Sequence, residues 1–340
     1  MMLHPWDEER LTAEIEGYHD SLEAGCEEVY QIAEAARAQG KDFVERVEIP
    51  RATDLASRTE RLLEKYLEGE KFEEELRELL LANDDRETTA IEMSKRIASR
   101  MHERTGDLVK AIDTGLRVGL AILTEAILVA PLDGIANVRL LHNADGSQFV
   151  SVDFCGPIRA AGGTAQALAV LITDLVRREL GVGPYVARFE EVERVKEEFG
   201  LYRKNLQYRP SPEELDIIVK ACPVMVNGES TENEECAGYG TLENVDGTRV
   251  RGGVMLVIGE GLCLKAPKLQ KHTERLQVEG WEFISHFVKG KADGDDGENG
   301  GHRRRIEPNA RFMEDIIAGR PVFGEPSKAG GFRLRYGRTR

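Results

Sequence analysis

The stretch VDFCGPIRAAGGTAQALAVLITDLVRREL, residues 152–180, constrains the fold of this chain more than any other segment. Side chains alternate from residue 149 to residue 154, which predicts a strand, and the run rich in Ala and Leu after residue 164 predicts a helix. Between them stand Arg159 and the pair Gly162-Gly163, and Thr164 is placed to cap the helix. The order predicts a strand, a glycine turn and a helix start.

Two interpretations of this unit are open. Unpaired backbone N–H groups and the positive end of a helix bind anions, so the turn predicts a phosphate site. Its candidate residues are Arg159, Gly162, Gly163 and Thr164. Many strand-to-helix turns, however, carry glycine for backbone geometry only, and the spacing alone favours such a packing turn.

The elements on either side divide the chain into a helical part and an α+β part. Through residues 1–130 apolar residues recur at helical spacing between charged ones, which predicts an acidic helical N-terminal domain. Through residues 131–289 strands and helices are interspersed, so the predicted fold class is α+β, with a mixed α/β second domain. The expected strands are Ile135–Leu141, Gln148–Phe154, Val224–Gly228 and Thr248–Gly259, the first two joined at Asp145-Gly146 and the last crossed by Gly252-Gly253.

Charge is distributed unevenly along the chain, whose formal net charge is −15. Residues 290–306 are a polar low-complexity insertion, and residues 307–340 are a basic segment. Residues 301–340 hold nine Arg and one Lys against three Glu and one Asp, a local balance of +6. Basic residues contact nucleic-acid phosphates, although an Arg-rich solvated edge explains the pattern equally well. The candidate nucleic-acid-binding residues are Arg303, Arg304, Arg305, Arg320, Lys328, Arg333, Arg335, Arg338 and Arg340. Arg249, Arg251, Lys265 and Lys268 form a second, weaker basic set.

Composition and motifs exclude several classes of protein. The longest apolar run is too short and too charged to span a bilayer, and the acidic N-terminus lacks the apolar core of a signal peptide. We therefore expect a cytoplasmic protein that does not associate with a membrane. The five cysteines never occur as C-x-x-C, which predicts no structural metal and no disulfide framework. Walker, nucleophile-elbow and H-E-x-x-H motifs are missing, so we name no catalytic residue.

Five strings from residue 154 onward carry a family resemblance. They are FCGPIRAAGGTAQALAVL, NLQYRPSPEEL, RVRGGVMLVIGEGLCLKAPKL, GWEF and AGRPVFGEPSKAGGFRLRYGRTR, in this order. Together they resemble the N-terminal part of the large subunit of the archaeal D-family DNA polymerase, also called DNA polymerase II.

The resemblance implies a function for the full subunit and a division of labour within it. It implies template-directed DNA synthesis with Mg²⁺, and a 3′–5′ exonuclease activity associated with the heterodimer. The implied partners are the small nuclease subunit, primer–template DNA and a sliding clamp. The catalytic aspartates of the family lie in a β-barrel core in later sequence, into which residues after about Arg320 would lead. We therefore expect this chain to be a fragment that cannot polymerise alone.

Two alternatives remain. One is a non-catalytic nucleic-acid-binding or scaffold module of a replication complex. The other is a separate phosphate-ligand enzyme built on the glycine turn. An Asp-rich string near residue 295 imitates a metal motif, but it has no apolar flanks that would fix its geometry.

Overall fold

The computed structural model of the chain describes residues 8–41, 52–124, 130–289, 322–323 and 332–333. These residues divide between two compact units, Met1–Leu62 and Leu63–Arg340. In the part described, no helix is both long enough and apolar enough to cross a membrane.

The described residues of the first unit form the helices α1 (Glu8–Ala38) and α2 (Leu55–Leu62). The chain leaves α1 through Gly40, whose φ of +67° is the left-handed conformation that commonly ends a helix.

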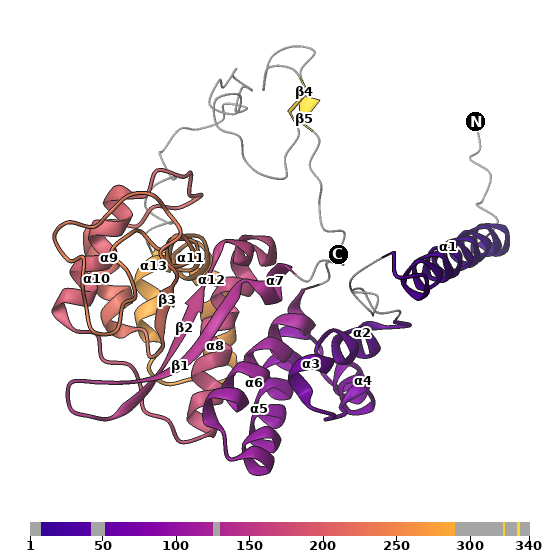
Figure 1. Ribbon diagram of the computed structural model, residues 1–340, viewed down its shortest axis with the longest axis horizontal. Coiled ribbons are helices and arrows are strands. Elements are labelled where there is room, and N and C mark those ends of the chain that lie inside the picture. The colour runs from indigo at the N-terminus through magenta and orange to yellow at the C-terminus, as the bar shows by residue number, and fades with distance from the viewer. Residues whose placement is uncertain (1–7, 42–51, 125–129, 290–321, 324–331, 334–340) are drawn as a thin grey trace, which may run out of the picture. The chain divides into compact units, whose positions relative to one another are not determined.

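The helical part of the second unit is built around α5, α6 and α8. Asp85 caps α5 by accepting a hydrogen bond from the Thr88 N–H at 2.7 Å, and Asp107 caps α6 through the Lys110 N–H at 3.0 Å. Helices α5 and α6 pack against each other and against α8 (Figure 1). The first helices of this unit are α3 (Glu64–Leu67), α4 (Glu73–Ala82), α5 (Arg86–Thr105), α6 (Leu108–Leu123), α7 (Ala130–Asp133) and α8 (Gly162–Glu179).

A three-stranded mixed sheet lies beside these helices. Strand β2 (Gln148–Phe154) is its centre, with β1 (Ile135–His142) antiparallel on one side and β3 (Met225–Gly228) parallel on the other. All of β2 except Gln148 is buried. The turn between β1 and β2 passes through Gly146 at φ +84°. Three of the four predicted strands, and the turn at Asp145-Gly146, are thus confirmed.

The fourth predicted strand, Thr248–Gly259, is wrong. The chain forms a short helix, α11 (Gly252–Met255), which continues into a π-helix, η2 (Leu256–Cys263). Every residue from 252 to 263 is buried. Because this run is apolar on all sides, its sequence has no period that would distinguish a buried strand from a buried helix.

The remaining elements complete an α+β fold, the predicted class. Helix α6, before residue 131, packs against α8, after it, so helices from both sides of that position share one core. The domain boundaries that we drew from the sequence stay predictions, and no β-barrel occurs among the described elements. The other elements are η1 (Gly156–Ala161), α9 (Phe189–Leu201), α10 (Pro212–Ala221), α12 (Ala266–Arg275), η3 (Glu282–Ile284), α13 (Ser285–Lys289), β4 (Val322–Phe323) and β5 (Phe332–Arg333).

Candidate functional site

The predicted glycine turn is a 3₁₀ turn, η1, that runs directly into α8. Its last residue, Ala161, has helical φ and ψ of −66° and −25° and makes no side-chain cap. The Gly162 N–H donates to the Arg159 carbonyl, so η1 already supplies an acceptor where α8 begins. Thr164 therefore lies inside the helix, and the prediction that it caps α8 is wrong.

The glycines of this region allow close packing between segments. A Cβ atom at Gly163 would lie 2.3 Å from the carbonyl O of Glu260 in η2. A Cβ at Gly253 would lie 2.0 Å from the carbonyl O of Phe154, at the end of β2. Both distances are shorter than a Cβ atom tolerates, so these two positions require glycine because backbone approaches backbone.

Arg159 is held at the surface beside this junction. Its Nη2 donates to the Asn205 carbonyl at 3.2 Å and lies 3.6 Å from Oε1 of Glu260. Glu260 is only 6% exposed, and the same Oε1 accepts the Gln207 N–H at 3.2 Å. Since the Arg159 side chain remains 40% exposed, it presents positive charge to solvent next to α8. Phosphate binding by Arg159, Gly162, Gly163 and Thr164 stays a prediction.

A buried ionic cluster, which the sequence did not reveal, joins α9 to α11. Glu198 is fully buried and receives both Nε and Nη2 of Arg251, at 2.8 and 2.9 Å. Arg194 adds a third bond to Glu198 at 2.9 Å, and its other nitrogens donate to four backbone carbonyls of residues 239–249. Asn227 of β3 accepts from Arg251 Nη1 at 2.6 Å.

The spacing of Arg194 and Glu198, four residues apart on α9, was the one available sequence signal. Such pairs usually lie on a solvated helix face, so the pattern does not indicate burial. Arg251, assigned from the sequence to a basic set, is 1% exposed and bound to Glu198, so it is a structural residue.

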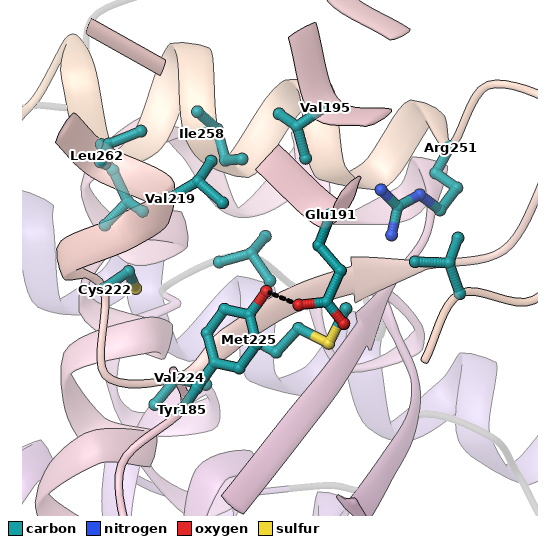
Figure 2. Close-up of a pocket in the computed structure, with 13 residues that line it drawn as sticks. Tyr185, Glu191, Val195, Val219, Cys222, Val224, Met225, Arg251, Ile258 and Leu262 are labelled. Atoms are coloured by element: carbon teal, nitrogen blue, oxygen red, sulfur yellow. Dashed lines mark hydrogen bonds between the residues drawn. The ribbon is translucent and has the colours of Figure 1, made fainter. Parts of the chain in front are cut away.

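A small cavity lies next to this cluster (Figure 2). The Tyr185 hydroxyl donates to Glu191 Oε2 at 2.7 Å on its wall, and burial raises the pKa of Tyr185 well above its ordinary value. The cavity has a volume of about 20 Å³, which is enough for one water molecule and far too small for a nucleotide. The cavity is therefore part of the core and not a substrate pocket.

Most of the predicted nucleic-acid-binding residues lie outside the described part of the chain. Arg333 belongs to β5, where it pairs with Val322 of β4 in an antiparallel ladder. The others stay predictions and lie outside the described residues: Arg303, Arg304, Arg305, Arg320, Lys328, Arg335, Arg338 and Arg340.

Within the described ranges, no group of three or more His, Cys, Asp and Glu side chains could hold a metal ion. The side chains that these ranges bring together do not fit the metal pair of a polymerase. No step of phosphoryl transfer is therefore assigned to them.

The fold and its sites thus define a helix-rich α+β protein with exposed cations and a buried ionic cluster. Residues 17–290 match the family described as DNA polymerase II large subunit DP2, N-terminal, and residues 296–340 match the central domain of the same subunit. The DNA polymerase II large subunit of Methanococcoides burtonii is 44% identical over 332 residues, and that of Methanocella arvoryzae is 46% identical over 332 residues.

The chain belongs to the DNA polymerase II large subunit family, which confirms the resemblance seen in its sequence. The alignments cover 96% of this chain but only 29% and 28% of those two relatives, so the chain spans less than a third of their length.

Proposed function

We propose that this chain acts as the N-terminal part of the large, polymerising subunit of an archaeal replicative DNA polymerase. The observation that carries the proposal is the match to two successive regions of that subunit, residues 17–290 and residues 296–340, in the same chain. In this role the chain supplies structure and nucleic-acid contacts, while chemistry belongs to the rest of the subunit.

The lack of a metal-binding cluster in the described ranges supports this division of labour. The Mg²⁺ ions of the full polymerase would be held in a β-barrel core outside this chain, and residues after about Arg320 would lead into that core. The chain on its own is then inactive. The partners in this proposal are primer–template DNA, the small nuclease subunit that brings the exonuclease activity to the heterodimer, and a sliding clamp, all in the cytoplasm.

A chimeric large subunit tests the proposal. This chain replaces the matching N-terminal region of the Methanocella arvoryzae protein, which shares 46% identity with it. The chimera, purified with its small subunit, should extend a primer when deoxynucleotides and Mg²⁺ are supplied. The chain alone should not.

Two results would overturn the proposal. A chimera that folds and assembles but does not extend primers would show that this chain is not the functional counterpart of the replaced region. Nucleotide incorporation by the chain alone, after removal of contaminating polymerases, would contradict the division of labour.

A further inference from the structure

Helix α1 carries a stripe of exposed apolar side chains. Among the described residues, five of the eight large apolar side chains that are exposed lie on this one helix, and each of the five is between 47% and 64% exposed. With about 100° between successive residues, the five fall within an arc of about 100°. Monomeric soluble proteins rarely leave a contiguous apolar stripe of this length uncovered, so the stripe indicates a binding surface. Its members, which we call the α1 seam, are Ile15, Tyr18, Leu22, Val29 and Ile32.

The spacing of the α1 seam is that of a coiled coil. Successive members are three, four, seven and three residues apart, which places all of them at the a and d positions of a heptad repeat. Gly25 occupies the one d position within this span that has no side chain. A stripe confined to a and d positions fits a single helix laid along it, whereas a helix that packs on a globular core buries a wider stripe. The geometry therefore favours another helix as the occupant of the seam.

The charge of α1 selects the kind of helix that fits. Its nine acidic residues and two arginines give a formal charge of −7, whichever ion pairs form within the helix. Glu28, which is exposed, borders the α1 seam at a g position. A second copy of α1 would lay another −7 beside the first, so charge disfavours a homodimer at this seam. A helix with Lys or Arg at its flanking positions has the complementary charge.

From this arrangement we infer that the α1 seam is the docking site for a basic amphipathic helix of another protein chain. The partner helix has its own apolar residues at a and d, and Lys or Arg at the e and g positions beside them. Apolar contact along the seam supplies the affinity, and the charges at the flanks select this partner over an acidic one. The inference goes beyond the proposed function and does not depend on it.

Two fluorescent synthetic peptides of equal length test the inference by anisotropy. Both have Ile at every a position and Leu at every d position. The first, the Lys peptide, has Lys at every e and g position, and the second, the Glu peptide, has Glu there. The chain should bind the Lys peptide about tenfold more tightly than the Glu peptide at low salt, and this preference should shrink as salt is added, because the charges are at the surface.

A seam variant and a matched control separate apolar docking from attraction by charge. The seam variant, Leu22→Ser with Val29→Ser, should bind the Lys peptide about a hundredfold more weakly, since each buried side chain of this size contributes about a factor of ten. The control, Ala24→Ser with Gln31→Ser, changes the opposite side of α1 and should bind like the wild type. Both variants place two serines in the same helix and keep its charge, so they share any loss of helix propensity.

A charge variant tests the selection of the partner. Ser21→Lys with Glu28→Lys puts two cations at g positions beside an unchanged seam. This protein should bind the Glu peptide at least as well as the Lys peptide. A gain of binding to the Glu peptide cannot come from misfolding, so this result would support the seam directly.

Three outcomes would overturn the inference. If the wild type and the seam variant bind the Lys peptide equally, charge alone attracts the peptide. If the wild type binds neither peptide, the α1 seam is not open to a partner helix. If sedimentation equilibrium shows that the wild type is a dimer and the seam variant a monomer, the occupant is a second copy of the chain.

Discussion

At the scale of single residues, Glu198 holds together the most concentrated set of buried charge in the described chain. Its carboxylate lies between the guanidinium groups of Arg194 and Arg251, and all three side chains are at most 1% exposed. Each charge is out of water, so each depends on the others for the interactions that water would otherwise provide. The cluster is therefore stable only when all three charges are present, and the loss of its single acid, Glu198, should destabilise the protein.

Replacing Glu198 by Ala should therefore lower the free energy of unfolding by about 3–5 kcal/mol, because two buried cations lose their partner. Urea denaturation followed by circular dichroism measures this loss. Glu193→Ala is the matched control on the same helix, since Glu193 pairs with Lys196 at 2.7 Å and is only half-buried. That control should cost less than about 1 kcal/mol. Similar losses for the two variants would contradict the role given to Glu198.

The buried thiol of Cys222 should make the free energy of unfolding depend on pH in the alkaline range. Burial raises the pKa of Cys222 to about 12, whereas a thiol in the unfolded chain ionises near about 8.5. Between these values the unfolded state loses its proton first, so the free energy of unfolding should fall as pH rises above about 8.5.

Urea titrations between pH 7.5 and pH 10.5 check this expectation on the wild type and on Cys222→Ala. The curve of the variant should fall less steeply, by up to about 1.4 kcal/mol per pH unit. Parallel curves would show that the thiol does not ionise differently in the two states.

At the scale of elements, the junction between η1, α8 and η2 is determined by glycine. Gly163 lets the start of α8 approach the backbone of Glu260, and Gly261 packs against Gln166 on the next turn of the same helix. The spacing of glycines in this turn resembles a phosphate loop, but close packing is sufficient to explain Gly163.

The substitution Gly163→Ala should destabilise the protein by about 1–3 kcal/mol, because the new methyl group meets a backbone carbonyl that cannot move aside. The gain in helix propensity, about 1 kcal/mol, is smaller than this clash. Gly156→Ala is the control in the same turn, since a Cβ there meets nothing within 4 Å. It should leave stability within about 0.5 kcal/mol of the wild type. A stable Gly163→Ala protein would mean that packing does not require this glycine.

At the scale of the whole molecule, charge is divided between an acidic body and a basic end. The net charge of −15 combines a balance of +6 in residues 301–340 with −21 in the residues before them. An acidic body repels DNA, so any DNA that binds is expected at the local basic surfaces.

The basic end should therefore contribute to the salt dependence of DNA binding. Changing Arg333, Arg335 and Arg338 to Ala should reduce the slope of log affinity against log salt by about 2.7, or about 0.9 for each lost contact. The control replaces Arg77, Lys95 and Arg96, which are all paired with glutamates, by Ala. If the tail variant keeps the slope of the wild type, these arginines do not contact phosphate.

The sequence by itself determined the features that depend on neighbouring residues. The alternation of side chains predicted strands β1 and β2, and Asp145-Gly146 predicted the turn that passes through Gly146 at positive φ. Both signals are properties of a few adjacent residues. Membership of the polymerase family also followed from strings of the sequence, because they are long and specific.

Tertiary structure alone decided the features that depend on distant residues. Residues 252–263 are helical and not extended, Arg251 is buried, and the approach of Glu260 requires glycine at position 163. Each outcome is set by a partner at least 50 residues away: Glu198 for Arg251, Phe154 for Gly253 and Glu260 for Gly163. A local pattern carries no information about such partners, so burial and close approach emerged only when the chain folded.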